Sequence, residues 1–156
     1  ALTWHMVLST LHTKHAIGAI TRLIDLGVEP YLLSSALIGV VAQRLVRGIC
    51  PACKTRFIAP PDVVKRYGWE GQGQVHLSRG RGCQECYDSG YKGRFAIHEL
   101  LKVDETLERL VSNNPGREEL STYLREHNVT TLFEDGLKHA LEGETTIEEV
   151  SRVINV

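Results

Sequence analysis

The 156-residue sequence has almost no net charge, no long apolar run and no phosphate-binding loop. Its 18 basic and 19 acidic side chains give a formal net charge of −1, so bulk charge does not indicate a nucleic-acid partner. The longest uncharged apolar stretch, Pro30–Gln43, is shorter than the roughly 20 residues that a transmembrane helix needs. The absence of Gly-x-x-x-x-Gly-Lys-Ser/Thr excludes a nucleotide-cradling loop of that type within the chain.

The beginning of the sequence also lacks the features of a signal peptide. Residues 1–4 contain neither an initiator methionine nor a basic leader, and a strand-like run, Trp4–Ser9, follows almost at once. We therefore expect a chain that is part of a longer protein. The composition, 42% hydrophobic and 24% charged, is that of an ordinary folded domain.

The pattern of elements indicates an α/β fold. After the expected buried strand, helical spacing runs to Gly27, and a second, nearly all-apolar helix is expected from Tyr31 to Arg47. Glycine and proline then break the chain up to residue 94, leaving room for a short helix near 62–67. A strand over 95–103 precedes an acidic, helical remainder.

Helix-start signals divide that remainder. Asp104 is the expected N-cap of a helix over 105–113, and Pro115-Gly116 separates it from a helix over 117–127. Two capping-box patterns, Thr131-x-x-Glu134 and Thr145-x-x-Glu148, each predict a further short helix.

All four cysteines occur in two pairs with the same spacing, Cys50-Pro51-Ala52-Cys53 and Cys83-Gln84-Glu85-Cys86. A gap of two residues lets both sulfurs of a pair converge on one ion, and two such pairs complete a tetrahedral Zn²⁺ site. The long loop between the pairs costs little entropy once its ends meet. The spacing predicts structural zinc bound by all four thiolates, which leave no open position for catalysis.

Two disulfides or a redox Cys-x-x-Cys are the alternatives to zinc. A redox motif would occur once, at a strand–helix junction, and nothing in the sequence indicates a secretory context for disulfides. The neighbours of the pairs favour a metal site, since basic side chains can offset the charge of the thiolates and glycines permit tight turns. These neighbours are Arg47, Lys54, Arg79, Arg81, Gly48, Gly82 and Gly90.

His12 is the candidate catalytic residue. It follows the expected strand, where open α/β sheets bind ligands, and hydroxyl side chains that suit a phosphate surround it. The alternative is a histidine at the edge of the core, bonded to backbone. Arg22, Arg44 and Arg47 are candidate phosphate contacts, or else partners of helix dipoles and apolar surface.

These residues together resemble a known family. Residues 1–13 (ALTWHMVLSTLHT) closely resemble the His box of the secretion ATPases that power type II secretion and type IV pilus assembly. The resemblance covers most of the chain apart from about 54–80, and it continues through Ala19–Leu23, Ala42–Arg47, both cysteine pairs, Gly90–Arg94, Ile97–Leu100, Gly143 and Glu148–Val150. The sequence departs from the family at Trp4, usually Gly, and at Lys14, usually Asn.

The resemblance implies the C-terminal part of a hexameric RecA-like ATPase, α/β in class, with an inserted Cys₄ zinc-ribbon-like subdomain. Residues 1–47 would belong to the RecA-like core, residues 48–94 to the zinc-binding subdomain, and residues 95–156 to a strand followed by a helical subdomain. The family's P-loop, Asp box and Walker B carboxylate would lie upstream. We therefore expect this chain alone to be inactive, and the parent protein to use ATP and Mg²⁺.

By the same resemblance, His12 would lie near the γ-phosphate, with the three arginines close to the nucleotide. The four cysteines would hold the zinc domain that assembly ATPases have and retraction ATPases lack. The parent would be a homo-hexamer in the cytoplasm, held at the inner membrane by secretion or pilus platform proteins, with no transmembrane segment and no nucleic-acid partner.

Four functions remain open. Gly93-Arg94 and Ile97–Leu100 favour a type II secretion ATPase that assembles a pseudopilus, and a type IV or MSHA-type pilus assembly ATPase is the close alternative. A stand-alone zinc-ribbon interaction module is the alternative of another class. A thiol oxidoreductase would need labile disulfides.

Overall fold

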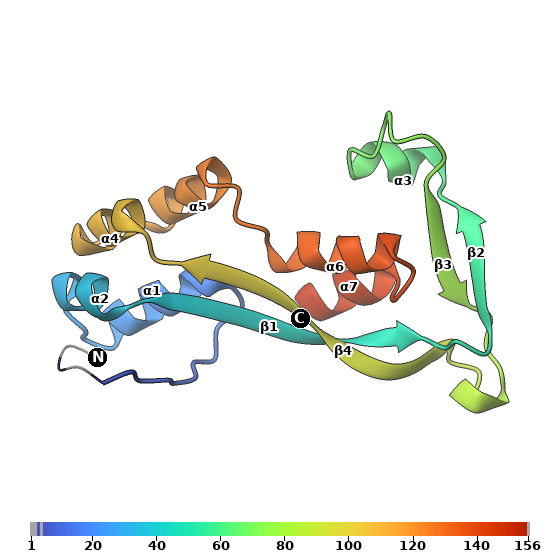
Figure 1. Ribbon diagram of the computed structural model, residues 1–156, viewed down its shortest axis with the longest axis horizontal. Helices are drawn as coiled ribbons and strands as arrows, with labels where there is room; N and C mark the ends of the chain where they lie inside the picture. The colour runs from blue at the N-terminus through green and yellow to red at the C-terminus, as the bar shows by residue number, and fades with distance from the viewer. Residues whose placement is uncertain (1–2, 4, 156) are drawn as a thin grey trace. The chain divides into compact units, whose positions relative to one another are not determined.

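The computed structural model describes residue 3 and residues 5–155, which form two compact units. Unit 1 combines residues 1–43 with 98–131, and unit 2 combines residues 44–97 with 132–156. Figure 1 labels the helices and strands, which in chain order are α1 (Ala16–Asp25), α2 (Pro30–Ala36), β1 (Gly39–Ile49), β2 (Lys54–Ile58), α3 (Pro61–Arg66), β3 (His76–Gly80), η1 (Gln84–Cys86), β4 (Tyr91–Lys102), α4 (Glu105–Ser112), α5 (Arg117–Glu126), α6 (Leu132–Leu141) and α7 (Ile147–Ile154). None of the helices within the described residues is long and apolar enough to cross a bilayer.

Strands β1 and β4 form a two-stranded sheet, and the boundary between the units falls within both strands. Their flanking hydrogen bonds show that they are antiparallel. The N–H of Val103 donates to Ile38 O at one end of the pair, and the N–H of Cys50 donates to Gly90 O at the other. The chain thus leaves β1 directly into the first cysteine pair.

Unit 1 contains the helices α1, α2, α4 and α5 and one end of the two strands. Helix α2 packs against α4, and α1 packs against α5, around the buried side chains of Ile20, Leu107 and Leu120. The expected N-cap Asp104 is confirmed, since its carboxylate accepts a hydrogen bond of 2.8 Å from the N–H of Leu107. Glu99 is buried on β4 and accepts a hydrogen bond of 2.8 Å from Ala16 N, which fixes the start of α1.

Unit 2 contains the paired strands β2 and β3 with the short helix α3 between them in sequence, and a pair of helices, α6 and α7. Strands β2 and β3 pair antiparallel, from Lys54 opposite Gly80 to Ile58 opposite His76. Helix α6 packs against both α7 and β3. The core beside β2 and β3 is a cluster of apolar side chains that reaches into both helices: Ala59, Trp69, Val75 and Leu77, with Phe57, Val63, Val64, Tyr67, Leu137 and Ile147 against them.

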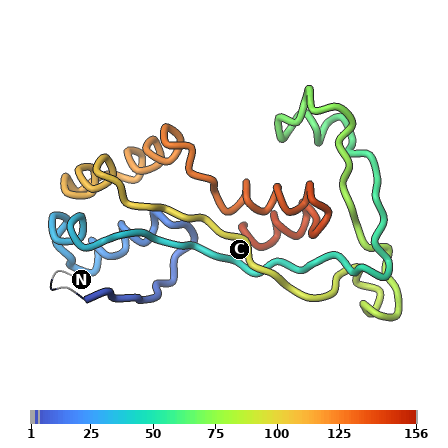
Figure 2. The backbone as a smooth tube through the Cα atoms, in the orientation of Figure 1, coloured from blue at the N-terminus to red at the C-terminus, as the bar shows by residue number. Residues whose placement is uncertain are grey.

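The expected buried strand at the beginning of the chain is wrong for the residues that the structure describes. Residues 5–9 have no regular structure, and Figure 2 shows them as an extended dark blue path. Met6, Val7 and Leu8 are exposed to 75%, 64% and 87%. A strand needs a neighbour for its backbone hydrogen bonds, and no described segment pairs with this one. Trp4, the first residue of the expected strand and one of the family departures, lies outside the described residues.

The expected helix from Tyr31 to Arg47 is also wrong beyond its first turns. Helix α2 ends at Ala36, and β1 begins at Gly39. Along β1, Ala42 and Val46 are buried while Val41 and Leu45 are exposed. A spacing of four residues keeps side chains on one face of a strand as well as of a helix, and β-branched Val40 and Val41 favour the strand.

The last helix begins one residue later than its capping box predicts. Thr146 is the N-cap of α7, and its Oγ1 accepts a hydrogen bond from the N–H of Glu149 at 3.1 Å. Thr145 is fully buried and donates its hydroxyl to Arg47 O at 2.8 Å instead. The two adjacent threonines therefore have different roles: Thr146 caps the helix, and Thr145 bonds to β1. A buried hydroxyl such as that of Thr145 needs a hydrogen-bond partner.

Candidate metal centre

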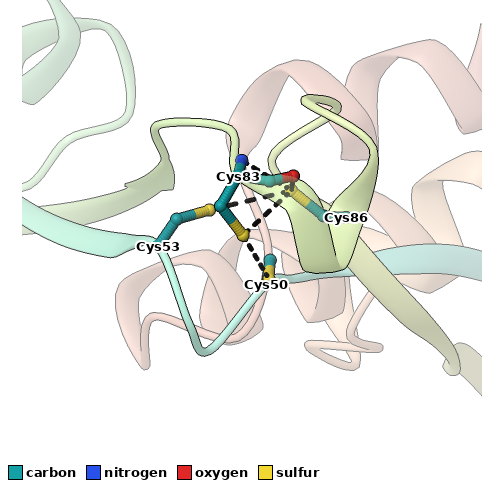
Figure 3. Close-up of side chains that lie close together, drawn as sticks. All are labelled: Cys50, Cys53, Cys83 and Cys86. Carbon is teal, nitrogen blue, oxygen red and sulfur yellow. Dashed lines mark hydrogen bonds between the residues drawn. The ribbon is translucent and has the colours of Figure 1, made fainter.

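Four strand ends and turns of unit 2 bring the cysteines together. Cys50 follows β1, and Cys53 precedes β2 after a tight turn. Cys83 is the N-cap of the short 3₁₀ turn η1, and Cys86 is the last residue of that turn, shortly before β4. Figure 3 shows the four side chains pointing toward one another, and all four sulfurs lie within 4.8 Å of one another.

The distances between the sulfurs fit a tetrahedral metal site. The Sγ atoms of Cys50 and Cys83 are 3.8 Å apart, as are those of Cys53 and Cys86. The Sγ atoms of Cys83 and Cys86 are 3.7 Å apart. A tetrahedral Zn²⁺ with Zn–S bonds of about 2.3 Å holds its sulfurs about 3.8 Å apart. A disulfide needs about 2.05 Å, so the four free thiols do not form disulfides, and their arrangement is compatible with a metal ion.

Backbone N–H groups stabilise negative charge on Cys86. Its Sγ accepts hydrogen bonds from the N–H of Cys83 at 3.3 Å and from the N–H of Gly90 at 3.2 Å. Burial alone would raise the pKa of this thiol, but the hydrogen bonds from Gly90 and Cys83 lower the pKa to about 6. Burial raises the pKa of Cys83 to about 11, and a bound metal ion would favour its deprotonated form.

Two glycines let the second pair fold tightly beside β3. Gly90 has φ +77, and a Cβ there would lie 2.7 Å from Gly80 O. Gly82 has φ +96, and a Cβ there would lie 2.9 Å from Asp88 O. Only glycine fits such contacts at positive φ, as expected for both positions.

The charges around the cysteines are only partly as expected. Arg47 is engaged by Glu149 at 2.7 Å, and the guanidinium of Arg79 lies over the ring of Phe57 at 5.2 Å. Lys92 is a basic neighbour that the sequence argument missed. Its hydrogen bond to Glu85, and the nearby thiols of Cys50 and Cys83, raise the pKa of its amine.

A second group with metal-ligand chemistry lies at the end of α6. The ligand atoms of His139, Glu142 and Glu144 lie within 4.8 Å of one another. The Nδ1 of His139 is only 2.7 Å from Oε2 of Glu144, which is the length of a direct hydrogen bond. A tetrahedral ion between such atoms would hold them more than 3 Å apart. The cysteines are therefore the better metal site.

The candidate nucleotide residues are divided between the units. His12 is exposed in the coil before α1, and Arg22 is exposed in the last turn of α1, so both belong to unit 1. Arg44 and Arg47 are half-buried on β1 in unit 2. The role of each residue at a nucleotide stays a prediction.

Arg47 instead belongs to an ionic cluster in which one buried carboxylate binds two half-exposed arginines. Glu149, whose side chain is 0% exposed, accepts hydrogen bonds from the Nη2 of Arg47 at 2.7 Å and from its backbone N–H at 3.0 Å. Arg152 donates to the same carboxylate from Nε at 3.0 Å and Nη2 at 2.7 Å. Burial alone would raise the pKa of Glu149, but the bonds from Arg152 and Arg47 outweigh it and lower the pKa to about 2.

This cluster predicts that Glu149→Gln destabilises the chain by about 3 kcal/mol at pH 7, because both arginines lose their charged partner. The folded pKa lies below the value of about 4.3 in an unfolded chain, so the contribution is complete above about pH 5 and is lost as pH falls toward 2. Urea unfolding at pH 7 and pH 3 should show the difference between wild type and variant shrink.

Glu148→Gln is the matched control for this variant, because Glu148 is exposed on the same turn. A loss of stability that is equal in the two variants, or that does not change with pH, would contradict the assignment.

Nearly the whole chain is similar in sequence to known proteins of one family. Residues 1–152 match the family described as "Type II/IV secretion system protein". The chain is 47% identical over 153 residues to the type II secretion system protein E of Pseudomonas aeruginosa, covering 98% of this chain and 30% of that protein. It is 48% identical over 153 residues to the type IV pilus assembly ATPase PilB of Thermus thermophilus, covering 96% of this chain and 17% of that protein.

A solved structure shares the fold. The pilus retraction motor PilT, solved with bound ADP, matches with a TM-score of 0.58 and 21% identity, over 96% of this chain and 32% of that one. At most about a third of each of these relatives is spanned by this chain.

Proposed function

Because the chain belongs to the type II/IV secretion system protein family, we propose that it is one part of a motor ATPase that powers type II secretion. The observation that carries the proposal is the 47% identity to a type II secretion protein E over 98% of this chain. The activity belongs to the whole protein, because this chain spans less than a third of that relative. This part would contribute a metal-stapled subdomain and a histidine for the nucleotide site.

The metal is proposed to be a structural Zn²⁺ held by Cys50, Cys53, Cys83 and Cys86. The sulfur distances of 3.7–3.8 Å support it, since they equal those of a tetrahedral zinc–thiolate site. Four thiolates fill the coordination sphere, so the ion supplies folding energy and no Lewis acid for catalysis. In this role it joins the end of β1, the base of the β2–β3 pair and the start of β4 into one zinc-ribbon-like subdomain.

The nucleotide role is proposed for His12, with weaker support for the arginines. His12 is accessible, and Arg22 is exposed on the helix that follows it. Of the arginines on β1, Arg47 is the poorer candidate because Glu149 already binds its guanidinium. Assembly into a homo-hexamer on the cytoplasmic side of the inner membrane, through a platform protein, is part of the same proposal, and family membership supports it.

The isolated chain is expected neither to bind MgATP tightly nor to hydrolyse it. Phosphoryl transfer needs a loop that cradles the β- and γ-phosphates and a pair of side chains that hold Mg²⁺. The chain has no such loop, so a nucleotide would gain few contacts to offset the entropy lost on binding. Calorimetry and a phosphate-release assay on this chain and on the full-length protein test this.

ATP hydrolysis by the full-length protein, but not by the isolated chain, would support the motor proposal. ATP hydrolysis by the isolated chain would contradict the proposal that the activity belongs to the whole protein. If neither protein hydrolyses ATP, a zinc-ribbon interaction module without ATPase activity would be favoured.

Pilus assembly is the second candidate, because the identity to the Thermus pilus ATPase is 48%. The two functions predict different phenotypes for a strain without the gene. We expect loss of secreted enzymes from the medium with surface pili retained. Loss of pili with normal secretion would replace the first proposal with the second, and plasmid-borne wild-type gene is the control.

A further inference from the structure

The loop before α7 and its first turn bind the last residues of β1, immediately before the first metal-ligand cysteine. Three hydrogen bonds connect residues 144–149 to backbone groups of residues 47–49. Arg47 N donates to Oε1 of Glu149 at 3.0 Å, Thr145 Oγ1 donates to Arg47 O at 2.8 Å, and Ile49 N donates to Glu144 O at 2.9 Å. Both backbone groups of Arg47 are thus occupied by side chains of this segment.

The end of β1 is also held by the residues at the start of β4. Cys50 N donates to Gly90 O at 2.9 Å, and Gly90 N donates to Sγ of Cys86 at 3.2 Å. Tyr91 bonds Thr146 through the two hydroxyls at 2.6 Å, and the guanidinium of Arg47 lies over the Tyr91 ring at 4.2 Å. A continuous set of bonds therefore connects α7, the end of β1 and both cysteine pairs within unit 2.

Glu149 is the centre of this set. It is a fully buried carboxylate, a costly group to bury, and it receives both side-chain and backbone donors from Arg47. A salt bridge needs only the side chain of Arg47, so the additional bond to the backbone N–H fixes the path of the strand. Cys50, three residues further on, is 0% exposed and must place its sulfur to within a few tenths of an ångström for a regular zinc site.

We propose that Glu149 is a positioning residue for the metal centre: it orients the end of β1 so that Cys50 meets the other three sulfurs. The inference rests on the proposed zinc site and extends it to a residue far along the sequence. Zinc affinity would then depend on the hydrogen bonds that residues 144–149 make to the end of β1, and removal of the metal would weaken these bonds. Groups that hold a metal ligand without touching the metal change affinity by about 10-fold or more when they are replaced.

The test measures zinc affinity of the whole chain by competition with a chromophoric chelator. Glu149→Gln should weaken zinc binding about 10-fold. Thr145→Val, which removes the hydroxyl donated to Arg47 O but keeps the shape of the side chain, should weaken it in the same direction by less. Thr145→Val also provides a second measurement should Glu149→Gln fail to fold.

Two control variants separate positioning from a general loss of stability. Glu148→Gln makes the same chemical change one residue away on an exposed side chain. Val150→Ala removes two fully buried methyl groups of α7 that lie close to Gly136 of α6, but it leaves the bonds to β1 in place. Both variants should keep wild-type zinc affinity.

A second readout distinguishes positioning from simple weakening. With Co²⁺ in place of zinc, the visible absorption of the thiolate site reports its geometry. The Glu149→Gln spectrum should shift, whereas the spectra of the two controls should not. Wild-type affinity and spectrum in Glu149→Gln would overturn the positioning role while leaving the zinc site intact, and so would an equal loss of affinity in Val150→Ala. No metal binding by the wild-type chain would overturn the zinc site itself.

Discussion

Cys50→Ser is expected to abolish stoichiometric zinc binding, which would fall from about one Zn²⁺ per chain to none. A serine hydroxyl is a poor replacement for a thiolate, and loss of one of four ligands opens the tetrahedral site. Because Cys50 lies at the end of β1 and is fully buried, residues 48–94 should loosen. Unit 1, which contains none of the ligands, should remain folded.

The measurements are metal analysis of protein purified without chelator, and hydrogen exchange across the chain. His139→Gln is the control variant, because it disrupts the other group of candidate ligands, His139, Glu142 and Glu144. It should keep its zinc. A thiol titration before and after metal removal adds an independent check. Titratable disulfides and no zinc in the wild-type chain would contradict the metal assignment and favour the redox interpretation.

The cluster of four cysteines could be predicted from the sequence because the spacing within each pair is a local property. A gap of two residues fixes how the sulfurs of one pair converge, whatever the rest of the fold does. The structure adds what the spacing cannot contain, namely that the end of β1 and the start of β4 bring the two pairs together. The same holds for Asp104, whose cap depends only on the three residues that follow it.

The two wrong secondary-structure predictions have different causes. In one, the local pattern suits both a helix and a strand; in the other, a strand would need a neighbouring strand that the local sequence cannot specify. Ala42 and Val46 are four residues apart, which suits one face of either a helix or a strand, so pairing with β4 decides the matter. The segment over 5–9 has the composition of a strand but no neighbour among the described residues. Strand formation depends on a partner in a way that helix formation does not.

Glu149 could not be identified as a buried charge from the sequence. Glu148 and Glu149 are adjacent acids at the start of a helix, where either would suit the helix dipole. The expected capping box placed Glu148 at the capping position. The structure selects Glu149 because Thr146 caps α7, which turns the second acid toward Arg47 and Arg152. A shift of one residue in the cap therefore decides which acid is exposed.

In the full-length protein, His12→Ala is expected to lower kcat for ATP hydrolysis by about 10-fold or more, with little change in KM. A residue close to the transferred phosphate stabilises the transition state more than it stabilises bound ATP. A positioned acid or base contributes at least a hundredfold in favourable cases, so 10-fold is a lower bound for a histidine in that role. His12 lies in exposed coil and makes no contribution to the core, which lets activity change without loss of folding.

His76→Ala is the matched control, since His76 is a partly exposed histidine on β3 with no proposed role at the nucleotide. It should leave kcat, KM and hexamer formation unchanged. The two variants need equal thermal stability for the comparison to be fair, and nucleotide affinity should be measured separately by calorimetry. A His12→Ala protein that hydrolyses ATP at the wild-type rate would remove this histidine from the mechanism. A raised KM with unchanged kcat would instead assign it to ground-state binding, because uniform loss of affinity leaves the chemical step untouched.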